Sequence, residues 1–170
     1  MKKTITLFLL FSFCSVFSQE TVKDKFSVDY FGGFYSNFSD WKENGVMGGY
    51  EFSYNPKSIL YSVNFSVGLG ISQNLKTKDG YIQAFFESDL LIGKKFSLSN
   101  SIKIIPQVGV GYLHLTNHFQ EEPKNLIGLP IQVKILFFDN DATSFGLINH
   151  LILNNVQNNY SLNFTANFKF

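Results

Sequence analysis

The sequence predicts an all-β fold: an eight-stranded antiparallel up-and-down transmembrane β-barrel that follows an N-terminal signal peptide. Three observations support this prediction. Apolar and polar residues alternate in runs of about ten residues, as in strands with two different faces. Turn signals separate the runs, and no helical period interrupts them. The chain of 170 residues is 17% aromatic but only 16% charged, against roughly 25% charged in a typical soluble domain.

The first residues predict export. Two lysines form a basic start, residues 5–17 (ITLFLLFSFCSVF) form a short apolar core, and a cleavage site is expected after Ser18. The apolar core is shorter than the roughly 20 residues that a membrane-spanning helix needs. We therefore expect a signal peptide over residues 1–18 and a single barrel domain over residues 19–170.

Cysteine usage and charge exclude several classes of protein. Cys14 lies in the apolar core, and Phe13 precedes it where a lipoprotein signal needs a small residue, so no lipidation is expected. After cleavage no cysteine remains for a disulfide or a thiolate metal site. All fourteen basic residues are lysines, and loss of the two at the start leaves a net charge of −1. This balance predicts no nucleic-acid partner.

The first four expected strands end at recognisable turns or loops. Residues 27–38 precede the polar loop SDWKENG, and residues 46–54 end at the tetrad NPKS, with proline at its second position. Residues 59–72 run into the polar loop QNLKTKDG, and residues 81–92 turn at GKK. Each connection is short enough to join neighbouring antiparallel strands.

The second four strands continue the same pattern. Residues 96–115 precede the loop TNHFQEEPKN, residues 126–138 turn at DND, and residues 143–153 lead through NNVQNN to residues 160–170. The run 96–115 is about twice the length a strand needs to cross a bilayer, so part of it is expected to project or to form the preceding turn. Connections after odd strands should be longer than those after even strands, as in membrane barrels.

Two segments fit this pattern poorly. Pro106 and Pro130 lie within strand-like runs, and a closed barrel has no free edge for them, so bulges are expected there. Residues 143–153 are apolar on both faces, which leaves the register of the seventh strand open.

The character of the polar face decides which side of the barrel is inside. Alternation alone also fits a soluble barrel with an apolar ligand cavity. A polar face in water is usually rich in Lys and Glu, whereas small residues suit the narrow lumen of an eight-stranded barrel. The third run has small uncharged residues on this face: Ser62, Asn64, Ser66, Gly68, Gly70 and Ser72. We therefore expect the polar face inside and the apolar face towards lipid.

Aromatic residues are expected to form two girdles at the membrane interfaces. One girdle, at the expected periplasmic strand ends, comprises Phe26, Tyr54, Tyr61, Phe96, Phe137, Phe168 and Phe170. The other comprises Phe38, Tyr81, Tyr112 and Tyr160.

The inward register places seven charged residues in the lumen. A buried charge needs a partner, so we expect a structural network of ion pairs and hydrogen bonds, with a gate or small-ion pathway as the alternative. The residues are Asp29, Glu51, Glu87, Asp89, Lys103, Lys134 and Lys169.

The last strand resembles the C-terminal assembly signal of Gram-negative outer-membrane barrels, which ends on an aromatic residue with alternating apolar residues upstream. The residues that carry it are Tyr160, Leu162, Phe164, Phe168 and Phe170. Together with the strand number and loop pattern, the chain resembles the small OmpA/OmpX-like eight-stranded outer-membrane β-barrel superfamily. The resemblance implies an outer-membrane location, contact with the lipid bilayer and insertion by the barrel-assembly machinery.

One group of residues raises the question of a metal site. His114 and His118 with Glu121 and Glu122 (HLTNHFQEE) offer imidazole and carboxylate ligands. They straddle a strand end and a loop, and no second cluster completes the coordination. We interpret them as solvated residues and predict neither a metal nor a cofactor.

A second group bears on catalysis. Lipid A deacylases of the PagL type carry a motif resembling His-x-Ser-Asn in a late strand. Here Ile152 follows His150 where the serine nucleophile would stand, and no acid follows in the chain. We predict no catalytic site and a satisfied interior histidine.

These observations predict a non-enzymatic outer-membrane barrel with a structural or surface-contact role. Its extracellular loops, above all the one with Trp41, are the expected places of partner contact, although no partner is identified. Two alternatives stay open: a lipid-modifying outer-membrane enzyme of unrecognised chemistry, and a soluble exported barrel that binds an apolar ligand.

Overall fold

The computed structural model describes residues 26–37, 43–56, 59–73, 80–117, 123–139 and 142–170, and the structural statements below concern these residues. The expected signal peptide, Phe38, Trp41 and the side chain of Tyr81 lie outside the described part. In the described part, no helix is long and apolar enough to cross a membrane.

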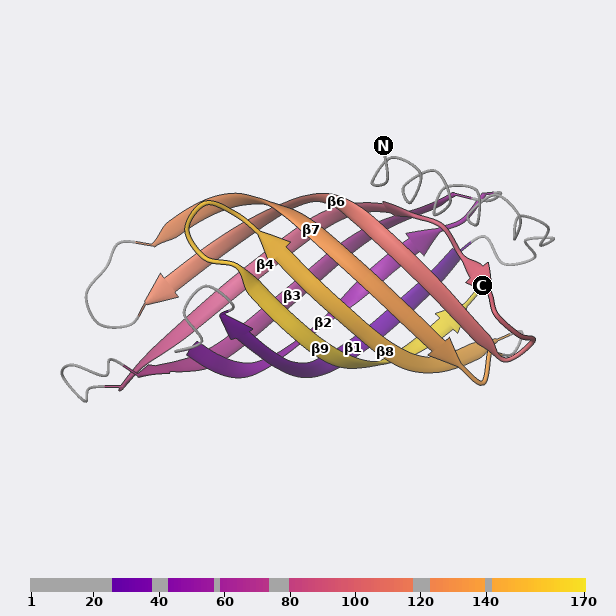
Figure 1. Cartoon of the computed structure of the whole chain (residues 1–170), viewed down its shortest axis with the longest axis horizontal. Coiled ribbons are helices and arrows are strands. Elements are labelled where there is room, and N and C mark those ends of the chain that lie inside the picture. Colours follow the sequence, from indigo (N-terminus) through magenta and orange to yellow (C-terminus); the bar gives the residue numbers. More distant parts are fainter. Residues whose placement is uncertain (1–25, 38–42, 57–58, 74–79, 118–122, 140–141) are drawn as a thin grey trace, which may run out of the picture.

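The described chain forms a closed antiparallel barrel (Figure 1). Consecutive strands pair, β1 pairs with β9, and β4 pairs with β6, so eight long strands complete the circle. This confirms the predicted fold class. The strands are β1 (Phe26–Asn37), β2 (Glu43–Tyr54), β3 (Leu60–Gln73), β4 (Gly80–Gly93), β5 (Phe96–Ser97), β6 (Ile102–Asn117), β7 (Lys124–Phe137), β8 (Thr143–Leu153) and β9 (Asn159–Lys169).

The last strand is held on both edges. β9 pairs with β1 on one side and with β8 on the other. Its final residues are also bound, because Lys169 N donates to Ala142 O and Phe170 N donates to Phe26 O, both at 2.9 Å. We call the end of the barrel that holds Phe26 and Phe170 the terminus end, and the opposite end, with Asn37, the far end.

The polar face of the strands is the inside of the barrel, as predicted. Along β9, Leu162 and Phe164 point outward and are 40% and 69% exposed. The alternate residues face the lumen and are at most 4% exposed: Ser161, Asn163, Thr165 and Asn167. The same alternation fixes the register of β8, where Ile148, His150 and Ile152 point inward. A period of two therefore gives the barrel an apolar outer face and a largely polar interior.

The predicted difference in length between the connections at the two ends is wrong. The long run 96–115 divides into β5, a bend and β6, so that residues 94–101 connect β4 to β6. At the far end the strands extend into the expected loops. The far-end connections cover residues 38–42, 74–79, 118–123 and 154–158, and the others cover residues 55–59, 94–101 and 138–142. Backbone pairing continues past the point where hydropathy alternates, so hydropathy marks the strand ends poorly.

The two prolines are accommodated without the expected bulges. Pro106 lies one residue beyond the last β4–β6 pair, so its missing N–H faces the point where β4 ends. Its carbonyl still accepts a hydrogen bond from Lys94 N at 3.2 Å. Pro130 falls in a short gap of the β6–β7 ladder, and the ladder resumes in unchanged register on the other side.

Outward aromatic residues are not confined to two girdles. Phe26 and Tyr54 stack at the terminus end with ring centroids 4.8 Å apart, as one girdle predicts. However, Tyr50, Phe65 and Phe86 form a row near the middle of β2, β3 and β4, with successive centroids 5.5 and 6.5 Å apart. Cross-strand aromatic contacts stabilise sheets. Part of the aromatic content therefore supports strand pairing rather than interface position.

Candidate functional site in the barrel lumen

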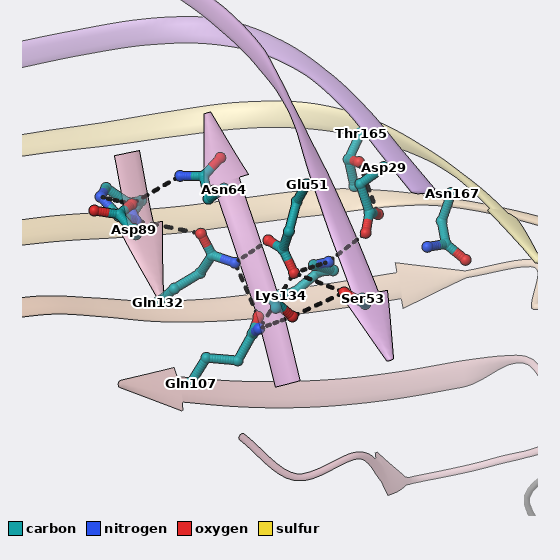
Figure 2. Close-up of polar contacts among 12 residues, drawn as sticks. Asp29, Glu51, Ser53, Asn64, Asp89, Gln107, Gln132, Lys134, Thr165 and Asn167 are labelled. Carbon is teal, nitrogen blue, oxygen red and sulfur yellow. Dashed lines mark hydrogen bonds and ion pairs between the residues drawn. The ribbon is translucent and has the colours of Figure 1, made fainter. Parts of the chain in front are cut away.

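The middle of the lumen holds a charged cluster from three strands: Asp29 of β1, Glu51 of β2 and Lys134 of β7 (Figure 2). We call it the central cluster. Lys134 Nζ lies 2.5 Å from Asp29 Oδ2 and 3.1 Å from Glu51 Oε1. Thr165 Oγ1 donates to Asp29 Oδ1 at 3.1 Å. Since Asp29 and Glu51 are opposite each other in the β1–β2 register, strand pairing itself brings two carboxylates together and calls for a cation between them.

Neutral donors complete the coordination of Glu51. Its Oε1 accepts hydrogen bonds from Ser53 Oγ at 3.0 Å and Gln107 Nε2 at 3.2 Å. Its Oε2 accepts one from Gln132 Nε2 at 2.7 Å (Figure 2). A buried ion pair is stable only when the remaining lone pairs are also satisfied. These donors explain how the lumen holds a carboxylate that is fully shielded from water.

A second cluster lies on the far side of Gln132. It consists of Glu87 and Asp89 from β4 and His150 from β8. His150 Nε2 lies 2.7 Å from Glu87 Oε1 and 3.8 Å from Asp89 Oδ2. Its other ring nitrogen, Nδ1, lies 3.2 Å from Gln132 Oε1, so one glutamine links the two clusters. Asn64 Nδ2 donates to Asp89 Oδ2 at 2.8 Å.

An apolar layer crosses the far half of the lumen, which is therefore not polar throughout. It is formed by Tyr35, Met47, Phe85, Leu113, Leu115 and Ile152, with Phe31 and Leu126 packed against it. Glycine provides the room, because a Cβ on Gly68 would lie 2.2 Å from the Phe85 ring. Beyond this layer, towards the far end of the barrel, Tyr35 Oη donates to Glu43 Oε1 at 2.8 Å and Gln157 Nε2 donates to Glu43 Oε2 at 3.0 Å.

The terminus end carries a third group of charges. Asp139, in the β7–β8 connection, forms ion pairs with Lys103 of β6 and Lys169 of β9. Burial tends to raise the pKa of Asp139, but hydrogen bonds from the two lysines outweigh it and hold the pKa below its usual value. Nearby, burial and the charge of Lys103 lower the pKa of Lys95 to about 8. A small cavity of about 30 Å³, whose lining includes Lys95, Lys134 and Lys169, has room for roughly one water molecule.

Solved structures of small outer-membrane barrels share this architecture. Neisserial surface protein A matches with a TM-score of 0.67 and 9% identity, over 89% of this chain and 100% of that chain. The outer membrane protein OprG from Pseudomonas aeruginosa matches with a TM-score of 0.59 and 12% identity, over 87% and 97%. The N-terminal β-barrel domain of OprF from the same organism matches with 0.56 and 9%, over 86% and 98%. The fold is that of a small outer-membrane barrel.

At these identities the likeness concerns the fold alone. No family model matches the chain. A search of curated proteins gives no match either. What the barrel does must therefore be argued from its own residues.

Within this outer-membrane barrel fold, the seven charged residues predicted for the lumen fall into three groups. The central cluster contains three of them and the second cluster two. The remaining two, Lys103 and Lys169, meet at Asp139, which the sequence reasoning missed because a period of two does not extend into a turn. Gln132 was also missed, although it lies at an inward position of β7 and could have been found by the same period.

The histidine-rich stretch HLTNHFQEE is only partly described. His114 lies on the outer face of β6, where its Nδ1 is 2.7 Å from Asn125 Oδ1. The same oxygen accepts a hydrogen bond from Tyr112 Oη at 2.7 Å. The other residues proposed as alternative metal ligands, His118, Glu121 and Glu122, lie outside the described residues.

Proposed function

We propose that this chain is an integral outer-membrane protein of a Gram-negative envelope, with a structural or surface-contact role and without enzymatic activity. The proposal rests on the positions of apolar side chains outside the barrel and charged side chains inside it. Along β3, the outward residues Val67, Leu69 and Ile71 are each 59–60% exposed, whereas the charges of the lumen are buried. Such an apolar surface favours aggregation in water, while a bilayer stabilises it.

The packing of the lumen supports a closed barrel rather than a pore. The central cluster joins β1, β2 and β7 across the interior, and the apolar layer crosses the far half. The charged residues of both clusters thereby act as structural ties between strands. A soluble barrel with an apolar ligand cavity would require the opposite arrangement, with polar side chains outside.

The position of His150 supports a non-enzymatic role. The side chain faces the lumen, is 4% exposed and contacts Glu87 and Gln132. A lipid substrate outside the barrel cannot reach it. Ile152, two residues later, is fully buried in the apolar layer and has no nucleophilic atom. If the barrel were instead a lipid-modifying enzyme, deletion of the gene would alter lipid A, which mass spectrometry of the extracted lipid detects.

Gel mobility after cell fractionation tests the proposed location. The outer-membrane fraction is run on a denaturing gel with and without boiling. We expect a detergent-extracted band that migrates faster when unboiled, because a closed barrel in a bilayer resists the detergent. Recovery in the aqueous fraction, without a heat-dependent shift, would reverse the assignment of inside and outside and refute the proposal.

Conductance tests the closed lumen separately. The refolded barrel is inserted into planar bilayers at neutral pH, with a general porin as the positive control. We expect no steady current, since both the central cluster and the apolar layer obstruct the path. A stable single-channel conductance would show that the lumen opens and would favour the small-ion pathway.

We further propose that outward residues of β9, together with Phe170 that follows it, act as an assembly signal read by the barrel-assembly machinery. The proposal names Tyr160, Leu162, Phe164, Phe168 and Phe170. Phe164→Ser should reduce the folded amount in cell outer membranes while leaving refolding in detergent intact. Phe145→Ser on neighbouring β8 is the matched control, because Phe145 is also outward and exposed. Equal losses for both variants would mean that an outward aromatic residue supports folding through lipid contact on any strand, and that β9 carries no assembly signal of its own.

Surface contact is proposed for the loops at the far end, above all SDWKENG with Trp41. Replacing only residues 38–42, which include Trp41 and lie between β1 and β2, by a Gly/Ser sequence of equal length leaves Glu43 in place and should leave the heat-dependent gel shift unchanged. Adhesion of the cells to a panel of host-matrix and cell surfaces is the readout. Adhesion identical to that of the unmodified strain would show that this loop does not make the proposed surface contact.

A further inference from the structure

Glu87, Asp89 and His150 bring three metal-ligand side chains together inside the lumen. One donor atom of each lies within 4.8 Å of the others, and all three residues are buried. Of these contacts, the pair between His150 Nε2 and Glu87 Oε1 is the tightest, at 2.7 Å, and the pair between His150 Nε2 and Asp89 Oδ2 measures 3.8 Å. In a tetrahedral site with bonds of about 2.1 Å, ligand atoms lie about 3.4 Å apart. The observed distances bracket this value, so small side-chain movements suffice.

Unsatisfied oxygen atoms beside the cluster provide a second, independent observation. Asp89 Oδ1 and Asn64 Oδ1 are buried without a hydrogen-bond partner, as is Ser66 Oγ on the same inward face of β3. Buried polar atoms in proteins nearly always have partners, and exceptions call for an explanation such as an ion. Asn64 already reaches Asp89 through Nδ2, and a half-turn of its amide would present Oδ1 in the same place.

The charge of the second cluster also favours a bound cation. The cluster combines two buried carboxylates with a single imidazole, and Lys134 is engaged by the carboxylates of the central cluster. An uncompensated buried carboxylate is costly, so the second cluster needs a cation or a proton. Gly111 on the neighbouring strand β6 makes room for the Asp89 carboxylate itself, since a Cβ there would lie 2.3 Å from Asp89 Oδ1.

The orientation of the histidine favours a metal ion. Gln132 Oε1 lies 3.2 Å from His150 Nδ1 and is placed to accept a hydrogen bond from an Nδ1–H group, which leaves Nε2 to face the carboxylates. Metal-binding histidines are commonly oriented in this way by an acceptor on the other ring nitrogen. Gln132 is itself fixed by donating to Glu51 Oε2 at 2.7 Å.

We propose that Glu87, Asp89 and His150 bind a divalent cation of the zinc class inside the barrel, with the Asn64 amide oxygen completing the site. Imidazole and carboxylate together suit zinc better than calcium or magnesium, which prefer oxygen ligands alone. The ion ties β4 to β8 across the lumen and adds to the ties made by Lys134. This site is independent of any surface-contact role.

Metal binding to the refolded barrel tests the site. The full mature chain is refolded in detergent from urea after chelator treatment, with Zn²⁺ or Co²⁺ present during refolding, and folding is verified by the heat-dependent gel shift. We expect one equivalent of zinc per folded barrel by elemental analysis. Co²⁺ should give the visible absorption of a four-coordinate site. A fully shifted band with no bound metal would overturn the proposal and leave a shared proton as the compensating charge.

Variants locate the ion. His150→Gln and Asp89→Asn should each reduce the zinc content at least tenfold while retaining the gel shift. His114→Gln is the matched control, because His114 lies on the outer face and should leave one equivalent bound. Binding that survives His150→Gln but is lost in His114→Gln would place the metal outside the lumen. Either that result or an undiminished zinc content in Asp89→Asn refutes the site.

Discussion

The central cluster and the second cluster contain the same number of carboxylates but compensate them differently. In the central cluster, Lys134 is the cation and contacts both Asp29 and Glu51. In the second cluster, His150 takes the place of the lysine and is close to Glu87 but 3.8 Å from Asp89. Both clusters lie in one lumen and share Gln132, so the difference comes from the local partners and not from the general environment.

Hydrogen bonding separates the two clusters further. Every carboxylate oxygen of the central cluster has a partner, whereas Asp89 Oδ1 in the second cluster has none. A fully satisfied network acts as a fixed tie between strands. An incomplete network at a buried site indicates where a ligand or a proton is still to be accommodated. The comparison therefore assigns scaffolding to one cluster and binding to the other.

Removal of Lys134 should produce the largest effect and break the central cluster. Lys134→Met leaves two carboxylates buried without their cation, and breaking such a pair costs about 3–5 kcal/mol. We expect a corresponding fall in the free energy of unfolding, measured by urea titration of the refolded barrel in detergent. The folded fraction is read from the heat-dependent gel shift at each urea concentration.

A charge-free version of the cluster supplies the control. In Lys134→Met combined with Asp29→Asn and Glu51→Gln, no uncompensated charge remains, so much of the lost stability should return. If the single variant Lys134→Met were as stable as the unmodified chain, the lysine would not act as a tie. The contrast between the two clusters would then have no energetic basis.

The sequence predicted the components of these clusters but not their pairing. A period of two along β1, β2 and β7 was sufficient to place Asp29, Glu51 and Lys134 inside. The contact of Lys134 with Asp29 joins strands that are far apart in the chain and depends on the curvature and closure of the barrel. Alternation within a strand carries no information on which inward residues meet across the lumen.

Substitution of His150 should have a smaller effect than substitution of Lys134. His150→Gln removes a partner of Glu87 but keeps a side chain that can donate a hydrogen bond. We expect a loss of about 1–3 kcal/mol in the free energy of unfolding, measured in the presence of a chelator. A loss as large as that of Lys134→Met would mean that the histidine compensates the second cluster as completely as the lysine compensates the first.

The apolar layer shows a further limit of the sequence. Phe31 and Tyr35 have the same parity as Asp29 and therefore face the lumen, although their composition resembles the lipid-facing side. Glycines on other strands make room for both rings: a Cβ on Gly49 would lie 2.8 Å from the Phe31 ring, and one on Gly70 would lie 2.1 Å from Tyr35 Oη. A large residue on one strand compensated by a glycine on another is a property of the assembled barrel and not of either run alone.

The charges at the terminus end offer a more accessible counterpart to both clusters. The pKa of Asp139 is held below its ordinary value, near 3.9, by Lys103 and Lys169. A lowered pKa in the folded state gives stabilisation that is present above the ordinary value and is lost as the pH falls through the folded value. Asp139→Asn should remove about 1 kcal/mol or less at neutral pH.

The pH dependence distinguishes this ion pair from general acid destabilisation. Urea midpoints of both chains are compared from neutral pH to below about pH 4, where the aspartate takes up its proton. The difference between the two chains should shrink as the pH falls. A constant difference over the whole range would show that Asp139 acts through shape or hydrogen bonding and not through its charge.

Asp89→Asn should have the smallest effect on the metal-free barrel and gives the sharpest contrast with Lys134→Met. The amide keeps the shape of the side chain and removes one of two neighbouring buried carboxylates, so we expect a change of less than about 1 kcal/mol in chelator, or a gain in stability. With zinc at a hundred times its dissociation constant, the unmodified chain should gain about 2.7 kcal/mol in its free energy of unfolding, whereas the variant gains nothing. The unmodified chain should then be the more stable of the two. Urea titrations with chelator and with zinc measure both terms on the same protein. A large loss in chelator would mean that Asp89 is already compensated, and the two clusters would then be alike.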